Sequence, residues 1–452
     1  MTECVPQLSL DFHPEVAVTM RFDAPQISSD GGAVLLRQVD DRLGLSAWVA
    51  TALPDKRSPQ RVIHDRHEQV RQRLYQIALG YEDCNDATQL RHDPVLKTVC
   101  DREPEDERGL SSQPTLSRLE NAVDMASVKR LIEGLEDSWV SELNENTTEV
   151  VLDIDTTDDP THGGQQLSFF HGYYDHHMYH PLLIFDGEGQ LVSVVLRPGN
   201  VHAGRGAMSV LQRVIGKLKA RFPEGQVVVR ADAGFALPRI FARLEQLNAE
   251  FGGVDYLIGV AKNPALLRLA EPALRAAEDK YGHSGDHVRD CSTLHYAAES
   301  WPHRRAVVLK AEVGTQGRNP RFVVTTLDGF DATLLYDAYC DRGQSENHIK
   351  DFKNALAADR LSCSSFVANS LRLLLHAAAY RLMRALRQAV GTVRRDLERM
   401  QFDTLRLRLL KVAALVRRSA RRLWIQLPAA FPLGAVFRNL AEQLAAPRAA
   451  PA

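Results

Sequence analysis

The order of strand-like and helix-like segments that begins at residue 150 restricts the fold of this chain more than any other feature. Apolar runs bounded by turn residues are typical of strands, and apolar side chains at intervals of three and four are typical of helices. Three strands are followed by a helix, a strand, a helix and a strand, at residues 150–155, 181–185, 191–196, about 206–221, 227–232, 238–250 and 256–260. The turn Asp186-Gly187-Glu188-Gly189 is typical of a hairpin between the second and third strands. This order predicts a mixed sheet flanked by helices.

The same order is that of an RNase H-like core, so we expect an α/β fold with three further regions around that core. Residues 1–147 are interpreted as a helical N-terminal domain. The core domain covers residues 148–390 and is interrupted by a β-containing insertion at about residues 262–338. Residues 391–452 are predicted to form a basic helical C-terminal region.

Several segments outside the core support this division. The pattern at 67–79 places Val70, Leu74, Ile77 and Ala78 at helical spacing. The segment SQPTLSRLEN at 112–121 reads as a short helix, and both the second helix of a small DNA-binding unit and an ordinary capped helix explain it. Strand candidates at 305–310 and 321–326 indicate that the insertion contains β-structure.

Composition excludes several classes of protein. Hydrophobic residues make up 44% and charged residues 25% of the 452 residues, which rules out collagen-like, coiled-coil and largely disordered chains. The most apolar stretch, 371–379, contains Arg372 and His376, so we expect no membrane span. The N-terminus does not read as a secretory signal, and the six cysteines show no paired spacing, so we expect a cytoplasmic protein.

Charge is distributed unevenly along the chain. The net charge is −2, yet the segment from Arg360 to Ala452 contains 17 basic and only four acidic residues. The pairs Arg394-Arg395, Arg417-Arg418 and Arg421-Arg422 lie in this segment. A basic end on an otherwise acidic chain is typical of polyanion binding, although a solubilising surface is the alternative.

Two acidic positions follow apolar strands. In 150–157 (VVLDIDTT) the alternation of a strand places Asp153 and Asp155 on one face, with Asp155 where the loop begins. The very apolar segment 227–231 ends at Asp232, which precedes Ala233 and Gly234. Carboxylates at strand ends lie where ligands usually bind in an α/β sheet, whereas a single example is more often a helix cap. Two on neighbouring strands favour a site.

A third polar pattern follows the insertion. Tyr339, Arg342, Glu346 and Lys353 are spaced by three, four and seven residues, so on one helix they would form a single stripe. The simpler alternative for Arg342 and Glu346 is an ion pair within the helix. Together with the two strand-end acids, Glu346 would complete a cluster of three carboxylates.

These blocks resemble the DDE transposases of bacterial insertion sequences, in the insertion-sequence-four-like branch. Its Tyr-x2-Arg-x3-Glu-x6-Lys signature is matched by Tyr339, Arg342, Glu346 and Lys353. The chain is especially similar to the family of insertion sequence 1380, through the segments SDGGAVLLR, YQIALGYEDCND, SQPTLSRLEN, FFHGYYDHHMYHPL and RADAGF. The resemblance covers roughly residues 20 to 390.

The resemblance implies a transposase that binds terminal inverted repeats and performs cut-and-paste strand cleavage and transfer. Its catalytic and metal-binding residues would be Asp155, Asp232 and Glu346, with Asp153 as the alternative to Asp155. Two Mg²⁺ ions would be the cofactors, and Mn²⁺ would substitute for them. Tyr339, Arg342 and Lys353 would hold DNA phosphates.

The implied partners are double-stranded DNA, as terminal repeats and target, and a second copy of the chain in the synaptic complex. Residues 1–147 would bind DNA, 148–390 would be catalytic, and 391–452 would contact DNA or the second copy. The protein would lie in the bacterial cytoplasm, at the nucleoid.

Two other functions and one metal site stay open. The alternatives are an RNase H-like nuclease without strand transfer and an inactive DNA-binding derivative. Histidines between residues 162 and 180 could bind a transition metal, but their spacing fits no familiar ligand pattern, so packing or DNA contact is favoured. This cluster comprises His162, His171, His176, His177 and His180.

Overall fold

The computed structural model describes residues 7–445 and divides into two compact units. The first unit contains the chain up to Ala122, residues Ala355–Ala357 and the chain from Ala378 onwards. The second unit contains Val123–Asn354 and Ala358–Ala377. The long helix α13 (Phe366–Val393) contributes residues to both.

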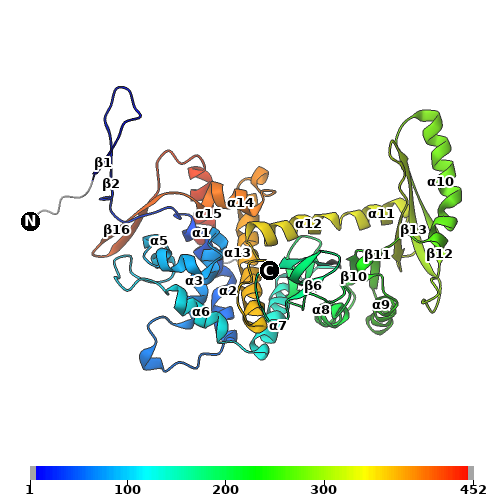
Figure 1. Ribbon diagram of the computed structural model, residues 1–452, viewed down its shortest axis with the longest axis horizontal. Coiled ribbons are helices and arrows are strands. Elements are labelled where there is room, and N and C mark those ends of the chain that lie inside the picture. Colours follow the sequence, from blue (N-terminus) through cyan, green and yellow to red (C-terminus); the bar gives the residue numbers. More distant parts are fainter. Residues whose placement is uncertain (1–6, 446–452) are drawn as a thin grey trace, which may run out of the picture. The chain divides into compact units, whose positions relative to one another are not determined.

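The second unit is built on a large mixed sheet (Figure 1) with the strand order β12-β13-β15-β11-β10-β4-β8-β9. Its strands are β4 (Glu149–Thr156), β8 (Leu182–Asp186), β9 (Leu191–Val195), β10 (Gln226–Ala231), β11 (Val254–Val260), β12 (Val288–Tyr296), β13 (Arg305–Gly314) and β15 (Arg321–Thr325), and the short β14 (Gly317–Arg318) pairs with β13. Strand β4 runs parallel to β10 and antiparallel to β8, and β10 is parallel to β11. The α/β class and the expected succession of three strands, helix, strand, helix and strand are confirmed.

The two faces of this sheet are covered by different helices. Alternate residues such as Leu152, Ile154 and Val229 pack with α7 (Met125–Glu142), α8 (Ala207–Arg221), α9 (Pro238–Phe251) and α10 (Pro264–Ser284) in one apolar core. The opposite face carries a smaller cluster with helix α11 (Ala332–Cys340). Because side chains alternate along a strand, Asp153 and Asp155 are directed away from the larger core and toward the face of α11.

The region interpreted as an insertion extends the main sheet. Strands β13 and β15 match the two strand candidates, and β15 pairs with β11 of the core. The sequence reading missed α10 and β12. Strand β12 exposes or half-exposes most of its side chains, so its apolar alternation is weak, and α10 contains Pro272.

The expectation of one helix from Tyr339 onward is wrong. Helix α11 ends at Cys340, α12 spans Gly343–Lys350, and a π-helical turn, η4, follows at Asp351–Ala355. Ala357 then adopts a positive φ of 53°, which a regular helix does not allow, before α13 begins at Phe366. Tyr339, Glu346 and Lys353 therefore lie on α11, α12 and η4, and Arg342 lies in the turn between α11 and α12.

The first unit is mainly helical. Its helices are α1 (Ala33–Leu43), α2 (Leu45–Ala52), η1 (Pro59–Arg61), α3 (Arg66–Leu79), η2 (Cys84–Asp86), α4 (Ala87–Leu90), α5 (Pro94–Val99), α6 (Gln113–Asn121), η5 (Arg395–Leu397), α14 (Phe402–Leu405), η6 (Arg406–Leu410) and α15 (Gly434–Ala445). Helix α3 is central, because every residue from Gln69 to Leu79 is buried. Asp65 caps its first turn by accepting a hydrogen bond from the Glu68 amide, and Gly80 ends it at a φ of 88°.

The C-terminal region is not entirely helical, which corrects the expectation for residues 391–452. Strands β16 (Ala414–Ser419) and β17 (Arg422–Gln426) form an antiparallel ribbon that carries two of the arginine pairs. Strand β16 also pairs with β3 (Ile27–Ser28), far away in sequence. That pairing involves only Ala414 and Leu415, so the main partner of β16 is β17, which follows it in sequence. Because most side chains of the two strands are exposed, their sequence lacks the apolar alternation that indicates a strand.

Two short β-structures complete the description. Strands β1 (Gln7–Leu10) and β2 (Val18–Arg21) form a hairpin in the first unit. In the second unit β5 (Asp159–Pro160), β6 (Phe169–His171) and β7 (His176–Tyr179) form a small sheet within the histidine-rich segment. No helix among residues 7–445 is long and apolar enough to cross a membrane.

A buried ion pair in the first unit generates the first testable prediction. The side chains of Arg73 and Glu120 are completely buried, with Nε and Oε1 separated by 2.9 Å. Replacement Glu120→Ala leaves the guanidinium charge buried without its carboxylate, which should lower the free energy of unfolding by about 3–5 kcal/mol. Denaturant unfolding would measure this loss.

The matched control is Glu105→Ala, because Glu105 is an exposed glutamate of the same unit. We expect that variant to stay within about 0.5 kcal/mol of the wild type. Equal stability of the two variants would contradict the role given to the buried pair.

Candidate active site

Two of the predicted acids lie side by side at the ends of parallel strands. In the register of β4 and β10, Ile154 is opposite Ala231, and Asp155 and Asp232 are the next residues. Parallel strands end at the same edge of a sheet, so both carboxylates lie at one edge. The structure thus brings together the two strand-end acids that the sequence reading paired.

Asp155 is largely buried and is surrounded by charges. Its Oδ1 accepts a hydrogen bond of 2.8 Å from the Thr156 amide, and its Oδ2 lies 3.1 Å from Nη1 of Arg342. Burial raises the pKa of Asp155 to about 6 against the opposing effect of Arg342, and the negative charges of Asp232 and Glu346 raise it further. Three carboxylates therefore share one electrostatic environment.

Asp232 also serves as a local cap. Its Oδ1 accepts a hydrogen bond of 2.9 Å from the Gly234 amide and so begins the turn η3 (Ala233–Phe235). Asp232 therefore has the helix-capping role that is the simpler explanation of an acid at the end of one strand. It uses Oδ1, and no residue among 7–445 donates a hydrogen bond to Oδ2.

Asp153 has a different environment from Asp155. It is directly opposite Arg230 on β10, and the guanidinium binds both carboxylate oxygens at 2.7 Å. Arg230 also donates a hydrogen bond of 2.7 Å to the Ala338 carbonyl on α11. Asp153 is consequently a buried structural partner of Arg230, which favours Asp155 over this alternative as the reactive acid.

Helix α11, the turn after it and helix α12 carry Tyr339, Arg342 and the third acid, Glu346. Tyr339 packs so closely on the backbone of Gly259 that a Cβ there would lie 2.4 Å from the phenol oxygen. The Arg342 guanidinium lies 5.9 Å from the centre of the Tyr339 ring and bonds Asp155. Glu346 is exposed on α12. Arg342 and Tyr339 also line a cavity of about 470 Å³ with Lys262 and Arg321.

Lys353 is directed to another carboxylate. Its Nζ lies 2.6 Å from Oδ1 of Asp158, and His176 approaches the other oxygen of Asp158 at 3.5 Å. Asp158 was not identified from the sequence. Its position three residues after Asp155 was the only available signal.

The histidine-rich segment forms an aromatic cluster. His171 and His180 have ring centres 5.1 Å apart, and Tyr174 packs against both. Burial lowers the pKa of His180 to about 4, and burial together with the charges of Asp158 and Asp155 raises the pKa of Tyr174 to about 12. Tyr174 is thus a neighbour of the candidate site that the sequence reading missed.

The donor set of the site suits a divalent cation in chemical type. Asp155, Asp232 and Glu346 offer only carboxylate oxygens, which hard cations such as Mg²⁺ prefer. Burial and the charges of the neighbouring acids disfavour the ionised form of Asp155, and a cation among the three carboxylates would relieve this penalty. Within residues 7–445, however, no three His, Cys, Asp or Glu side chains are already arranged to hold a metal ion.

Comparison with known proteins decides the family. A family model described as "Transposase DDE domain group 1" matches residues 10–449. The chain belongs to this transposase family. The match covers both compact units of the DDE transposase, and the narrower assignment to the insertion sequence 1380 family stays a prediction.

The comparison with solved structures gives a more distant match, and the comparison with curated protein sequences gives no significant match. A solved structure titled "Cryo-EM structure of piggyBac transposase synaptic complex with hairpin DNA" is matched with a TM-score of 0.42 and 10% identity. The match covers 93% of this chain and 83% of that one.

The two neighbouring aspartates should respond oppositely to substitution. Asp153→Ala leaves Arg230 buried without its carboxylate and should lower the free energy of unfolding by about 3–5 kcal/mol. Asp155→Asn removes a carboxylate whose ionised form burial disfavours, so it should raise that free energy at pH 7.5 without divalent ions. Denaturant unfolding with a chelator would measure both changes. A large loss of stability in Asp155→Asn would contradict this assignment.

The gain from Asp155→Asn should depend on pH. Since the folded-state pKa is about 6 and the ordinary value is 3.8, ionisation destabilises the wild type as pH rises through this interval. The gain should therefore approach about 3 kcal/mol at pH 7.5, fall to about half of that at pH 5 and nearly vanish below pH 4. Unfolding curves of both proteins across this range would test it. A gain that does not change with pH would show that Asp155 ionises normally.

Proposed function

We propose that this chain is a DNA transposase that binds the terminal inverted repeats of an insertion sequence and moves them by cut-and-paste transposition. Its RNase H-like core would cleave and transfer DNA strands with two Mg²⁺ ions, held by Asp155, Asp232 and Glu346. The observation that carries this proposal is the position of Asp155 beside Asp232, with the charges of both Asp232 and Glu346 acting on it.

The chemistry explains why three carboxylates would be needed. Bound divalent ions would activate the attacking oxygen and stabilise the leaving oxygen of an in-line displacement at phosphorus. The carboxylates would hold these ions, and the partial burial of Asp155 and Asp232 would limit competition from water. Mn²⁺ would replace Mg²⁺, since both prefer oxygen ligands.

Arg342 would have two successive partners. In the structure it forms an ion pair with Asp155 and partly offsets the charges of the two neighbouring acids. With a cation held by the three acids, the Arg342 guanidinium would be available for a DNA phosphate, which it can bind in bidentate geometry. Tyr339 and Lys353 would contribute further phosphate contacts, Lys353 after leaving Asp158.

The arginine-rich ribbon of the first unit supports DNA as the partner. Arg417, Arg421 and Arg422 are exposed, and Trp424 of β17 is 49% exposed. A two-stranded ribbon of this kind fits the major groove of B-DNA. Arg418, by contrast, is already paired with Glu103 at 2.7 Å. We further propose that two copies of the chain pair two DNA ends.

The alternatives predict different outcomes on the same DNA. A nuclease of this fold would cut but would not join the ends to a target. An inactive derivative would bind the repeats without cutting. The presence of all three acids favours an active enzyme over such a derivative.

The decisive experiment measures cleavage of DNA that carries the element's own flanking repeats. Asp232→Ala and Glu346→Ala each remove a proposed metal ligand, so cleavage with Mg²⁺ should fall at least about 100-fold while DNA binding remains. The control is Asp341→Asn, because Asp341 is an exposed acid at the junction of α11 and α12. Its cleavage rate should equal that of the wild type.

Each other outcome has a distinct meaning. Binding without cutting by the wild type, also with Mn²⁺, would favour the inactive derivative. Cutting that survives both alanine substitutions would show that other acids hold the metal. Cutting without joining to target DNA would identify the nuclease.

A further inference from the structure

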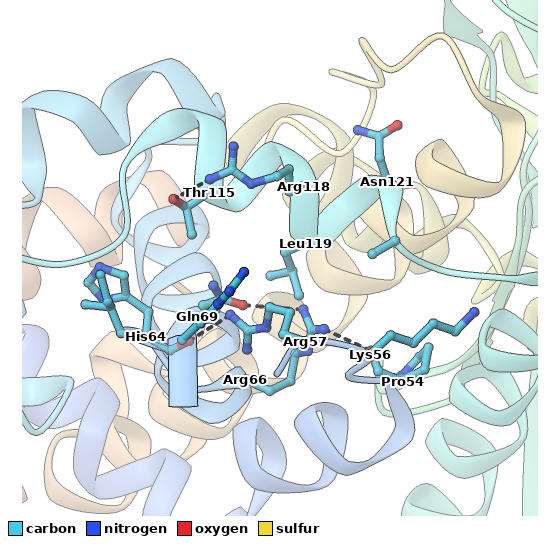
Figure 2. A pocket seen from close by; sticks show the side chains of 13 residues that line it. Pro54, Lys56, Arg57, His64, Arg66, Gln69, Thr115, Arg118, Leu119 and Asn121 are labelled. Carbon is cyan, nitrogen blue, oxygen red and sulfur yellow. Dashed lines mark hydrogen bonds between the residues drawn. The ribbon is translucent and has the colours of Figure 1, made fainter. Parts of the chain in front are cut away.

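A large basic pocket lies in the first unit. It has a volume of about 590 Å³ and is formed by the segment from Pro54 to Gln69 and by helix α6 with the residues that follow it. Figure 2 shows Arg118 and Asn121 of α6 on one side and Lys56, Arg57 and Arg66 on the other. All of its lining residues belong to the first unit, whereas the three candidate catalytic acids belong to the second.

Two of the five basic side chains that line the pocket have a carboxylate partner, and Arg118 donates a hydrogen bond of 3.2 Å to the Thr115 hydroxyl. Arg57 binds both carboxylate oxygens of Asp55, at 2.7 and 2.6 Å, and donates a further hydrogen bond to the His64 carbonyl. Arg66 lies 3.3 Å from the same carboxylate and donates to the Pro54 carbonyl. Asp55 therefore serves two cations, and it cannot neutralise both.

The remaining charges are not compensated. Lys56, Arg61 and Arg118 are exposed, and within residues 7–445 none of them has a carboxylate partner. In addition, Nε of Arg66 is buried without a hydrogen-bond partner, and the side chain of Arg66 is only 11% exposed. Positive charge that is gathered in a concave surface without matching acids attracts anions.

The rest of the lining indicates which anion would fit. Thr115, Arg118 and Asn121 recur at intervals of three along α6, so hydrogen-bond donors follow one face of the helix. Ile63 and Leu119 add apolar surface to the wall. The volume exceeds that of a lone phosphate, so phosphate groups joined by sugars fit better than an isolated ion. The backbone of DNA combines these features.

We propose that this pocket binds the sugar-phosphate backbone of DNA and gives the first unit a DNA contact of its own. Arg61 and Arg118 grip phosphates from opposite sides, while Thr115 and Asn121 donate hydrogen bonds and Ile63 and Leu119 contact the sugars. This inference rests on the proposed function, since it takes the substrate to be DNA. It assigns the anchoring of that DNA to residues that play no part in cleavage.

The test compares two double variants that remove the same charge. Arg61→Gln/Arg118→Gln removes two arginines without carboxylate partners from the pocket. Arg268→Gln/Arg275→Gln removes two exposed arginines from α10 of the second unit, where Arg275 pairs with Glu271 on the surface. Fluorescence anisotropy with the full chain and repeat-bearing duplex DNA gives the affinity at several salt concentrations. We expect the pocket variant to bind at least tenfold more weakly, with a salt slope lower by about 2.

The control variant should keep the wild-type affinity and salt slope. Equal losses in the two variants would mean that only overall charge matters, and no loss in the pocket variant would mean that DNA does not enter the pocket. Either result overturns the proposal. Thermal unfolding of both variants separates a binding defect from misfolding, and we expect little change because the replaced side chains are exposed.

A second measurement gives the position of the DNA directly. Asn121→Cys, labelled with a photoreactive group, should crosslink to duplex DNA, and excess unlabelled duplex should abolish the crosslink. Absence of a crosslink while the labelled protein still binds DNA would overturn the proposal. Failure of the proposed function gives a different result. A wild type that binds DNA through this pocket but never cuts it with Mg²⁺ or Mn²⁺ would support the pocket as a DNA-binding site and contradict the proposed enzyme activity.

Discussion

The buried ion pair between Asp153 and Arg230 is the interaction on which the geometry of the candidate site depends. It joins β4 to β10 through two contacts of 2.7 Å and reaches α11 through the Ala338 carbonyl. These three elements carry Asp155, Asp232 and the residues that lead to Glu346. Because a buried guanidinium is costly without its carboxylate, the pair holds the strands in the register that aligns Asp155 with Asp232.

Around this fixed frame the site itself is electrostatically unfavourable. Asp155 is largely buried beside two other acids, and Arg342 only partly compensates them. Closely spaced, partly buried carboxylates are typical of sites that hold cations, because a bound cation lowers their electrostatic repulsion. The paired Asp153 and the largely buried Asp155 are two residues apart, so one strand carries both the partner of Arg230 and a candidate metal ligand.

Much of this arrangement could be predicted from the sequence. The parts that could not be predicted have their physical causes in packing and exposure. The strands that end in Asp155 and Asp232 are apolar and locally determined, so their patterns were reliable. The sequence does not predict the ribbon carrying Arg417 and Arg422, because its mostly exposed, arginine-rich strands lack apolar alternation. The spacing from Tyr339 to Glu346 does not reveal the interruption at Asp341 and Arg342, because both residues keep right-handed helical backbone angles. Likewise, nothing local links Lys353 to Asp158.

The sequence by itself determined the order of elements, the alternation that places Asp153 and Asp155 on one face, and the acids at two strand ends, because these follow from the periods of strands and helices. Only the tertiary structure decided which of those two aspartates is structural, since that depends on Arg230, 77 residues away. It likewise decided that scattered arginines at 57, 61, 66 and 118 line one pocket. Contacts between residues distant in sequence are set by packing, and local patterns carry no record of them.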